Sequence, residues 1–428
     1  MGMKIGVMTL GCKVNKYESD ALINKLENLG FETTDKLEPA DIYVINTCAV
    51  TAEAEKKSRQ MIARCRRYNA NGKIFICGCA SQHNGKQFLD KNVEVVVGTS
   101  GKLKIIDFIE NLAQNNENYQ KNSEKIEDLP CFYQDDMQAK QSRTRAYIKI
   151  QDGCNNFCSY CIIPYLRGRS RSRELDSILN EAKNLGEDIK EIVLTGINVT
   201  DYKIDGKMGL LTLLEALDGL GKRLRLSSME DTLISEEFAK GLAKLKNFCP
   251  HFHLSLQSGC DSVLKRMNRH YTAEQFAQSV KLLRKYFPDA AITTDVIVGF
   301  PQESEEEFQK TYDFVEKVGF SQLHIFKYSQ REGTAAVKLY KDVPFAIKQS
   351  RLERLEKLNE KLKEKFLSDN NAGEVLFEEK DGKFYVGYTK NYIRCFVESK
   401  KSLTNQIHSV KFEEKYKDGM LAKLILKK

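Results

Sequence analysis

Three cysteines on one short segment are the residues of this chain best suited to metal chemistry. Cys154, Cys158 and Cys161 follow a C-x-x-x-C-x-x-C spacing directly after the apolar alternation of residues 147–150. This spacing places three thiolates on one loop that leaves a strand, where they can bind three irons of a cubic [4Fe-4S] cluster. The fourth iron then stays open for a further ligand.

An open iron is the place where S-adenosylmethionine binds in radical enzymes, so this cofactor is the expected ligand. The alternative is a structural zinc site, which needs four Cys or His ligands in closed tetrahedral geometry. The nearest other candidates along the chain are His83, Cys131, Cys249 and His251, all distant from the loop. Three merely buried thiols are the third possibility.

The composition favours a globular protein with reduced thiols. The chain has 428 residues, 41% of them apolar, and the length is typical of about three domains. No stretch approaches the roughly 18 apolar residues of a membrane span, and no apolar secretory segment begins the chain. We therefore expect a cytoplasmic protein without a membrane anchor, and the net charge of +8 permits a polyanionic partner.

The first part of the chain has the pattern of a doubly wound parallel α/β sheet. Short β-branched runs alternate with helical periodicity, and a helical stripe between the first two runs ends at Gly30. The four expected strands are residues 4–8, 41–45, 73–77 and 93–97.

A second set of cysteines follows three of these strands. Cys12, Cys48 and Cys79 each come just past a strand end. Parallel strands end at the same edge of a sheet, where such sheets bind ligands, so these thiols can converge. They fit either three core thiols or a second cluster.

Beyond a polar segment at 113–143, which we interpret as a linker, a longer β/α series begins. Six parallel strands with intervening helices predict an open, partial (β/α)6 barrel. The strands are expected at residues 147–150, 191–194, 223–226, 251–256, 291–298 and 322–328.

Reactive groups in β/α barrels lie at the carboxyl ends of the strands. Glu230 there can accept hydrogen bonds from ribose hydroxyls, and glycines allow the backbone to approach a ligand closely. The candidate cofactor-binding residues at these ends are Gly196, Glu230, Gln257, Ser258 and Gly299.

Two further regions indicate RNA. An arginine run beside the cysteine loop could hold phosphates or could be a solvated helix start. After an amphipathic helix at 346–367, the tail predicts a small antiparallel barrel with strands at 374–379, 384–389, 393–397 and 410–414. Aromatic residues among its charges are typical of base-stacking surfaces. The candidate RNA-binding residues are Arg167, Arg169, Arg171, Arg173, Tyr388 and Tyr392.

Several motifs together resemble the radical S-adenosylmethionine methylthiotransferases, over essentially the whole chain. They are the cysteine loop, residues 256–259 continuing to Met267-Asn268-Arg269, and residues 295–301. Residues 10–15, 331–334 and 387–392 are most similar to the MtaB-type branch, which acts on N6-threonylcarbamoyladenosine in tRNA. Lys16 and Lys327 depart from the expected Gln and Pro.

The resemblance implies domains at 3–112 (auxiliary cluster), 144–369 (radical domain) and 370–428 (a TRAM barrel). It implies an auxiliary [4Fe-4S] cluster on Cys12, Cys48 and Cys79 and a radical [4Fe-4S] cluster on Cys154, Cys158 and Cys161. The implied reaction adds a methylthio group at carbon 2 of the modified adenosine at position 37. The implied partners are the tRNA anticodon stem-loop and an electron donor such as flavodoxin or ferredoxin, with the enzyme a monomer.

Two alternatives remain open. A sister methylthiotransferase would act on isopentenyladenosine in tRNA or on an aspartate of a ribosomal protein. A non-catalytic RNA-binding iron-sulfur protein would form no 5′-deoxyadenosine on reduction. The remaining cysteines are interpreted as packing residues: Cys65, Cys77, Cys131, Cys249, Cys260 and Cys395.

Overall fold

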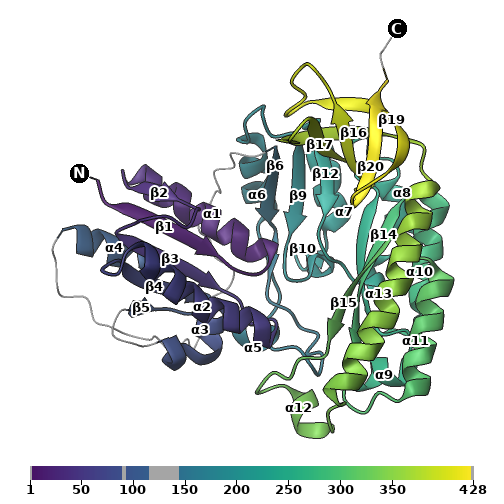
Figure 1. The fold of residues 1–428 in the computed structure, drawn as a ribbon, viewed down its shortest axis with the longest axis horizontal. Helices are drawn as coiled ribbons and strands as arrows, with labels where there is room; N and C mark the ends of the chain where they lie inside the picture. Colours follow the sequence, from purple (N-terminus) through teal and green to yellow (C-terminus); the bar gives the residue numbers. More distant parts are fainter. Residues whose placement is uncertain (1, 89–92, 115–143, 426–428) are drawn as a thin grey trace. The chain divides into compact units, whose positions relative to one another are not determined.

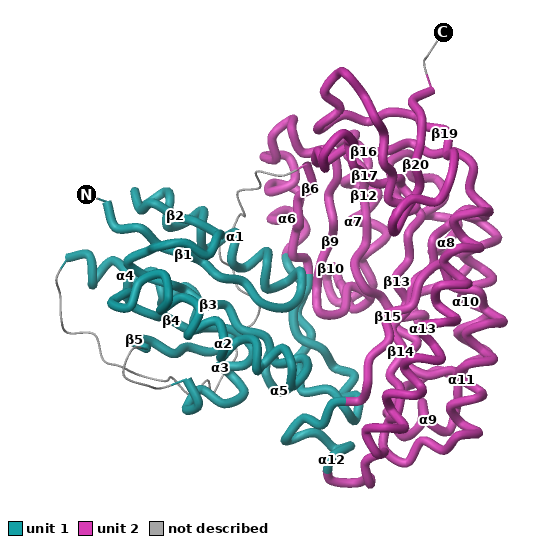
Figure 2. Tube along the Cα trace, viewed as in Figure 1, with its two compact units in different colours: residues 1–141, 151–173, 329–337 teal, residues 142–150, 174–328, 338–428 magenta. Residues whose placement is uncertain are grey.

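The chain forms two compact units, each discontinuous in sequence (Figures 1 and 2). The computed structural model describes residues 2–88, 93–114 and 144–425, so most of the predicted linker at 113–143, and Cys131, lie outside the described residues. Unit 1 comprises residues 1–141, 151–173 and 329–337, and unit 2 comprises residues 142–150, 174–328 and 338–428. This division differs from the boundaries expected from sequence, because the cysteine loop packs with the N-terminal sheet.

Unit 1 is built on a five-stranded parallel sheet in the order β2-β1-β3-β4-β5. The strands are β1 (Lys4–Thr9), β2 (Glu32–Thr34), β3 (Ile42–Thr47), β4 (Lys73–Gly78) and β5 (Val93–Val96). The doubly wound sheet is confirmed, with one strand more than the four expected. The short polar β2 has no apolar alternation and therefore gave no signal.

Helices cover both faces of this sheet, as its two separate apolar clusters show. α1 (Lys13–Asn28) and α4 (Lys104–Ala113) pack on one face through Leu22, Leu26 and Ile105. α2 (Ala52–Tyr68), α3 (Cys79–Asn84) and the 3-10 turn η1 (Gly85–Phe88) pack on the other. The Thr51 hydroxyl caps α2 by accepting from the Ala54 amide, which fixes where that helix begins.

The cysteine segment joins the second of these clusters. Its elements are β7 (Gln151–Asp152), α5 (Ile163–Arg167) and β8 (Arg171–Ser172), and β7 and β8 pair antiparallel. Ile162 and Leu166 are buried in the same apolar cluster as α2. Burial of these two side chains explains why the segment belongs to unit 1.

Unit 2 contains the six barrel strands in two parallel sheets (Figure 1). The strands are β6 (Arg145–Lys149), β9 (Glu191–Thr195), β12 (Arg223–Leu226), β13 (His251–Gln257), β14 (Ala291–Val298) and β15 (Gln322–Lys327). The sheets have the orders β12-β9-β6 and β13-β14-β15, and isolated bridges such as Met229 to Leu254 link them. All six predicted strands are therefore present.

Helices surround these strands and bury one continuous apolar core. The helices are α6 (Leu175–Lys183), α7 (Leu210–Asp218), α8 (Glu236–Leu242), α9 (Asp261–Arg266), α10 (Ala273–Tyr286), α11 (Glu305–Val318) and α13 (Phe345–Ser368). The short α12 (Ala335–Leu339) is divided between the two units. Shorter elements are η2 (Val199–Asp201), β10 (Lys203–Ile204), β11 (Lys207–Met208) and η3 (Asp231–Leu233). Capping boxes at Thr272 and Ser304 start α10 and α11.

The tail forms a closed barrel in the order β16-β17-β18-β20-β19. Its strands are β16 (Ala372–Asp381), β17 (Phe384–Thr389), β18 (Arg394–Glu398), β19 (Ile407–Tyr416) and β20 (Gly419–Leu424). The small barrel is confirmed, and β20 is an additional strand that closes it. Among the residues that the structure describes, no helix is long and apolar enough to cross a lipid bilayer.

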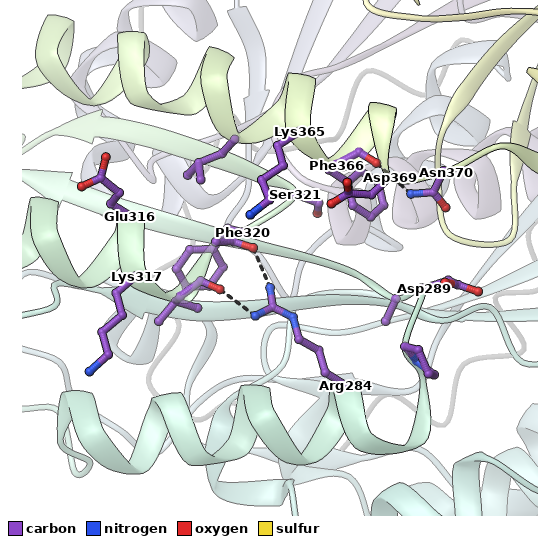
Figure 3. A pocket seen from close by; sticks show the side chains of 15 residues that line it. Arg284, Asp289, Glu316, Lys317, Phe320, Ser321, Lys365, Phe366, Asp369 and Asn370 are labelled. Atoms are coloured by element: carbon purple, nitrogen blue, oxygen red, sulfur yellow. Dashed lines mark hydrogen bonds between the residues drawn. The ribbon is translucent and has the colours of Figure 1, made fainter. Parts of the chain in front are cut away.

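A cavity of about 330 Å³ in unit 2 lies between the ends of α10, α11 and α13 (Figure 3). Arg284 reaches across it and donates to the carbonyls of Val318 (2.6 Å) and Gly319 (2.5 Å). The guanidinium thus satisfies carbonyls that α11 leaves unpaired at its end. None of the predicted site residues lines this cavity, so we assign it a structural role.

We expect Arg284→Met to lower the free energy of unfolding by about 2 kcal/mol, because two carbonyls lose a charged donor. Urea unfolding of the full chain measures the change. Lys317→Met is the matched control, since Lys317 lines the same cavity but is exposed. Its effect should stay within about 0.5 kcal/mol. Equal stability of both variants would contradict the capping role.

Candidate iron-sulfur and nucleotide sites

Cys12, Cys48 and Cys79 lie at the carboxyl ends of three adjacent strands, β1, β3 and β4. The loops that carry them touch. A Cβ on Gly11 would lie 2.6 Å from the Cβ of Cys48, and a Cβ on Gly78 would lie 2.5 Å from the Thr47 carbonyl oxygen. Both glycines also have positive φ, +99° and +101°. Only glycine fits these two positions, so the chain is shaped to bring these three loops together.

The three sulfurs also lie within electrostatic range of one another. The pKa of the Cys48 thiol is raised to about 11, mainly by burial and also by Cys79 and Cys12, against the lowering effect of Arg167. Burial likewise raises the pKa of Cys79, against the lowering effect of Arg167 and Lys102. Cys12 is exposed at the N-cap of α1. The three cysteines therefore fit an iron-sulfur cluster, in which iron takes the place of the proton on each thiol.

The zinc alternative has no support among the described residues. A zinc site requires ligands gathered around one ion. No group of three or more His, Cys, Asp or Glu side chains in the described part of the chain is placed to hold a single metal ion. A cubic cluster has a different requirement, because each of its thiolates binds a separate iron.

The second cysteine loop is framed by the β7–β8 hairpin. The Cys154 amide donates to the Gly168 carbonyl (3.1 Å), and a Cβ on Gly153 would lie 2.0 Å from the Arg169 carbonyl oxygen. Gln151 donates to the Gly153 carbonyl at 2.7 Å. Cys154 and Cys161 are half-buried and Cys158 is buried. The loop is thus held from its base, while Cys154 and Cys161 remain partly accessible.

The arginine run does not form a continuous phosphate-binding surface. Arg167 is 1% exposed and Arg173 is 6% exposed. Arg173 donates to the Tyr17 hydroxyl at 3.1 Å. For these two residues the predicted phosphate contact is corrected, because their guanidinium groups are enclosed by unit 1. Arg169 is exposed above the Phe157 ring, and Arg171 is half-buried, so both keep surface.

Arg167 instead connects the two cysteine sets within unit 1. Its Nε donates to the Cys79 sulfur at 3.4 Å, and its other nitrogens bind Asn15, Glu18 and Asp152. Sequence reasoning missed Asn15, Glu18 and Asp152. The sequence does place Asp152 just before the cysteine loop, and Asn15 and Glu18 just after Cys12, so their positions beside the cysteines could have indicated this role.

The predicted cofactor-binding residues all lie in unit 2 at strand ends. Gly196 follows β9, Gln257 ends β13 with a positive φ of +67°, and Ser258 is fully buried against Thr311. Glu230 follows β12 and pairs with Arg269 at 2.9 Å. The carboxylate of Glu230 is therefore already oriented by a cation.

Gly299 follows β14, and neighbouring side chains of unit 2 contact its backbone. Its amide donates to the Glu303 carboxylate at 2.7 Å, and a Cβ there would lie 2.3 Å from Cγ of Lys348. Glu303 is in turn bound by Arg351 at 2.8 Å. The Gly299 amide is thus engaged by the protein, and the backbone at this strand end is rigid.

Tyr388 and Tyr392 make contacts within unit 2 that the sequence did not indicate. Their rings stack on each other at 4.8 Å, and Tyr392 also stacks on His251 at 4.8 Å. Arg225 lies 4.6 Å above the Tyr392 ring. These contacts hold the tail barrel against β12 and β13. Tyr392 is still 39% exposed, so the RNA contact of this pair stays a prediction.

The other described cysteines agree with a packing role. Cys65, Cys249 and Cys395 have no exposed surface, and Cys77 and Cys260 are at most 4% exposed. Burial raises the pKa of Cys77 to about 12, so its thiol keeps its proton.

Two family descriptions match the chain. "Radical SAM superfamily" matches residues 148–315, and "Uncharacterized protein family UPF0004" matches residues 4–98. Among solved structures, the radical S-adenosylmethionine methyltransferase TsrM from Kitasatospora setae has a TM-score of 0.57 at 15% identity, over 76% of this chain and 72% of that one. At this identity the likeness concerns the fold alone.

Curated relatives cover nearly the whole chain. The threonylcarbamoyladenosine tRNA methylthiotransferase MtaB of Bacillus subtilis (strain 168) is 38% identical over 97% of this chain and 96% of its own. The Thermotoga maritima protein of the same name is 36% identical over 98% and 96%. The tRNA-2-methylthio-N(6)-dimethylallyladenosine synthase of Thermodesulfovibrio yellowstonii is 35% identical over 91% of each chain.

The matched segments contain the structural features described above. The radical SAM match includes the loop of Cys154, Cys158 and Cys161, and the N-terminal match includes Cys12, Cys48 and Cys79. The family implies S-adenosylmethionine, a [4Fe-4S] cluster and a tRNA substrate. This chain belongs to the family of radical S-adenosylmethionine tRNA methylthiotransferases.

Proposed function

We propose that this enzyme adds a methylthio group to carbon 2 of N6-threonylcarbamoyladenosine at position 37 of tRNA. The observation that carries the proposal is the identity of 36–38% over nearly the full length to proteins named for this activity. The product is 2-methylthio-N6-threonylcarbamoyladenosine.

Two [4Fe-4S] clusters serve this reaction. Cys154, Cys158 and Cys161 hold the cluster that binds S-adenosylmethionine, and Cys12, Cys48 and Cys79 hold the auxiliary cluster. Carbon 2 carries an unactivated C–H bond, beyond acid–base catalysis, so bound cofactors supply radical chemistry and sulfur. The convergence of the β1, β3 and β4 loops at Gly11 and Gly78 supports the auxiliary site.

The protein residues bind and orient. Gly196, Glu230, Gln257, Ser258 and Gly299 form the S-adenosylmethionine site, where Arg269 fixes the Glu230 carboxylate as an acceptor for ribose hydroxyls. The proposed functional domains are residues 3–112 for the auxiliary cluster, 144–369 for the radical chemistry and 370–428 for the tail barrel.

The substrate is the anticodon stem-loop of the tRNA, and Arg169 and Arg171 contact its phosphates. The exposure of Arg169 supports this assignment. Flavodoxin or ferredoxin supplies electrons, and the enzyme acts as a monomer in the cytoplasm, where its tRNA substrate is found.

A second candidate substrate is isopentenyladenosine in tRNA. The identity of 35% over 91% of the Thermodesulfovibrio yellowstonii protein favours it as the alternative. The two substrates share the reacting carbon and differ only in the group on N6.

Mass spectrometry of tRNA nucleosides from cells that lack this gene tests the proposal. Complementation with the intact chain should restore 2-methylthio-N6-threonylcarbamoyladenosine, and complementation with Cys154→Ala should not. Restoration of the isopentenyl analogue alone would assign the second substrate. If neither nucleoside changes, the proposal fails, and a ribosomal-protein substrate or a non-catalytic role takes its place.

A further inference from the structure

Arg167 is a buried cation whose most unusual partner is a sulfur atom. Its Nε lies 3.4 Å from Sγ of Cys79, and the side chain is 1% exposed. A guanidinium has five N–H donors in a fixed fork and cannot lose its charge in proteins. Its N–H therefore points at a sulfur that the proposed function assigns to the auxiliary cluster.

The direction of that N–H is fixed by three other side chains. Arg167 donates to Asn15 Oδ1 (2.7 Å), to Glu18 Oε1 (3.0 Å) and to Asp152 Oδ1 (3.1 Å). Asn15 in turn donates to the carbonyls of Leu10 and Thr47, which lie in the loops of Cys12 and Cys48. The guanidinium thus belongs to a bonded network that reaches all three auxiliary cysteine loops.

Two cations act on the Cys79 sulfur. Arg167 and Lys102 both lie within electrostatic range of it, and Lys102 also pairs with Glu18. Arg171 lies 3.8 Å from Asp152, another partner of Arg167. Positive charge beside this sulfur complements a thiolate, which is the form that binds iron.

We propose that Arg167 is a positioning residue for the auxiliary cluster. Its guanidinium donates an N–H to the Cys79 thiolate and thereby raises the reduction potential of that cluster. Hydrogen bonds to cluster sulfurs and nearby positive charge are among the factors that set such potentials. The inference rests on the proposed function in one respect, that Cys79 is a cluster ligand.

The test is an EPR-monitored redox titration of the full chain in the Cys154→Ala, Cys158→Ala and Cys161→Ala background, which isolates the auxiliary cluster. Arg167→Lys should lower the reduction potential of the auxiliary cluster by at least about 59 mV, which is a tenfold change in the equilibrium constant of a one-electron reduction. Arg173→Lys is the matched control, because it changes a buried arginine of the same run that donates to the Tyr17 hydroxyl. Its potential should equal that of the background protein.

Glu18→Gln gives a second readout with the opposite sign. It removes a negative charge 3.0 Å from Arg167 and should raise the potential. A residue with only a packing role would not produce shifts of opposite sign. Glu18→Gln also decides the question if Arg167→Lys does not fold, since an unchanged or lower potential would overturn the proposal.

A wrong ligand assignment would give a different titration result from a wrong role of Arg167. If the background protein with intact Cys12, Cys48 and Cys79 binds no cluster, the ligand assignment is wrong. If the cluster is present and Arg167→Lys leaves its potential unchanged, or Arg173→Lys shifts it equally, the role of Arg167 is overturned while the ligand assignment stands.

Discussion

Cys79→Ala should abolish methylthiolated tRNA while the protein still forms 5′-deoxyadenosine from S-adenosylmethionine. Cys79 lies at the end of β4, in a loop fixed against the Thr47 carbonyl, whereas the loop of Cys154, Cys158 and Cys161 is held by the separate β7–β8 hairpin. Cys79→Ala removes one bond of Arg167, but the backbone contact of Cys154 with Gly168 does not involve Cys79, so the second loop should keep its conformation. Liquid chromatography of 5′-deoxyadenosine and mass spectrometry of the tRNA from the same reaction measure both products.

Cys154→Ala should lower both products to background, because this loop provides the site where S-adenosylmethionine binds a cluster. The two variants thus separate cofactor cleavage from sulfur transfer. Equal loss of 5′-deoxyadenosine in Cys79→Ala and Cys154→Ala would contradict the division into two independent sites.

Cys77→Ala is the matched control for Cys79→Ala. Cys77 is two residues away on β4 but packs in the opposite apolar cluster of the sheet, with Ile5 and Val44. Removal of this buried sulfur leaves a small cavity and costs on the order of 1 kcal/mol of stability, while both products should remain. Loss of methylthiolation in Cys77→Ala instead would show that the wrong thiol was assigned.

The sequence was sufficient for most strands because buried parallel strands contain short runs of apolar, β-branched residues. Residues 223–226 and 291–298 were predicted with the bounds that β12 and β14 have in the structure. The same reasoning placed Cys12, Cys48 and Cys79 at one sheet edge, since parallel strands share a direction. β2 was missed because Glu32–Thr34 is short and polar.

The roles of single side chains depended on long-range partners that periodicity does not reveal. Arg167 donates to the carboxylate of Glu18, which is 149 residues away in the chain. Tyr392 meets Arg145, which is 247 residues away. A basic run and an aromatic pair look like RNA-binding surfaces when only their local sequence is considered. The tertiary structure buries Arg167 against Glu18, so its predicted phosphate contact was wrong, whereas Arg169 and Tyr392 remain exposed.

The largest stability effect is expected from Glu191, whose carboxylate is fully buried in unit 2. Arg225 donates to it twice, at 2.7 and 3.0 Å, and Arg145 lies 3.1 Å away. The same arginines bind the tail barrel: Arg225 donates to the Lys390 carbonyl, and Arg145 donates to the Tyr392 hydroxyl. Glu191 therefore neutralises the two cations that attach the barrel to β6 and β12.

The pKa of Glu191 determines the pH range in which its carboxylate stabilises unit 2. Burial alone would raise this pKa, but Arg225 and Arg145 outweigh burial and lower it to about 2, from an ordinary value of 4.5. A folded-state pKa below the unfolded one means that the stabilisation is present above about pH 4.5 and is lost as the pH falls toward 2. The corresponding contribution is about 3 kcal/mol at neutral pH.

Glu191→Gln should accordingly lower the free energy of unfolding of unit 2 by about 3 kcal/mol at pH 7 and flatten its dependence on pH in the acid window. Urea unfolding at a series of pH values measures both effects. Glu374→Gln is the matched control: Glu374 also pairs with a barrel-binding arginine, Arg223, but its side chain is 48% exposed. An exposed pair contributes at most about 1 kcal/mol, so the control should change little. If the two variants lose equal stability, the barrel is held by its surface contacts, and the buried carboxylate is not the group that fixes it.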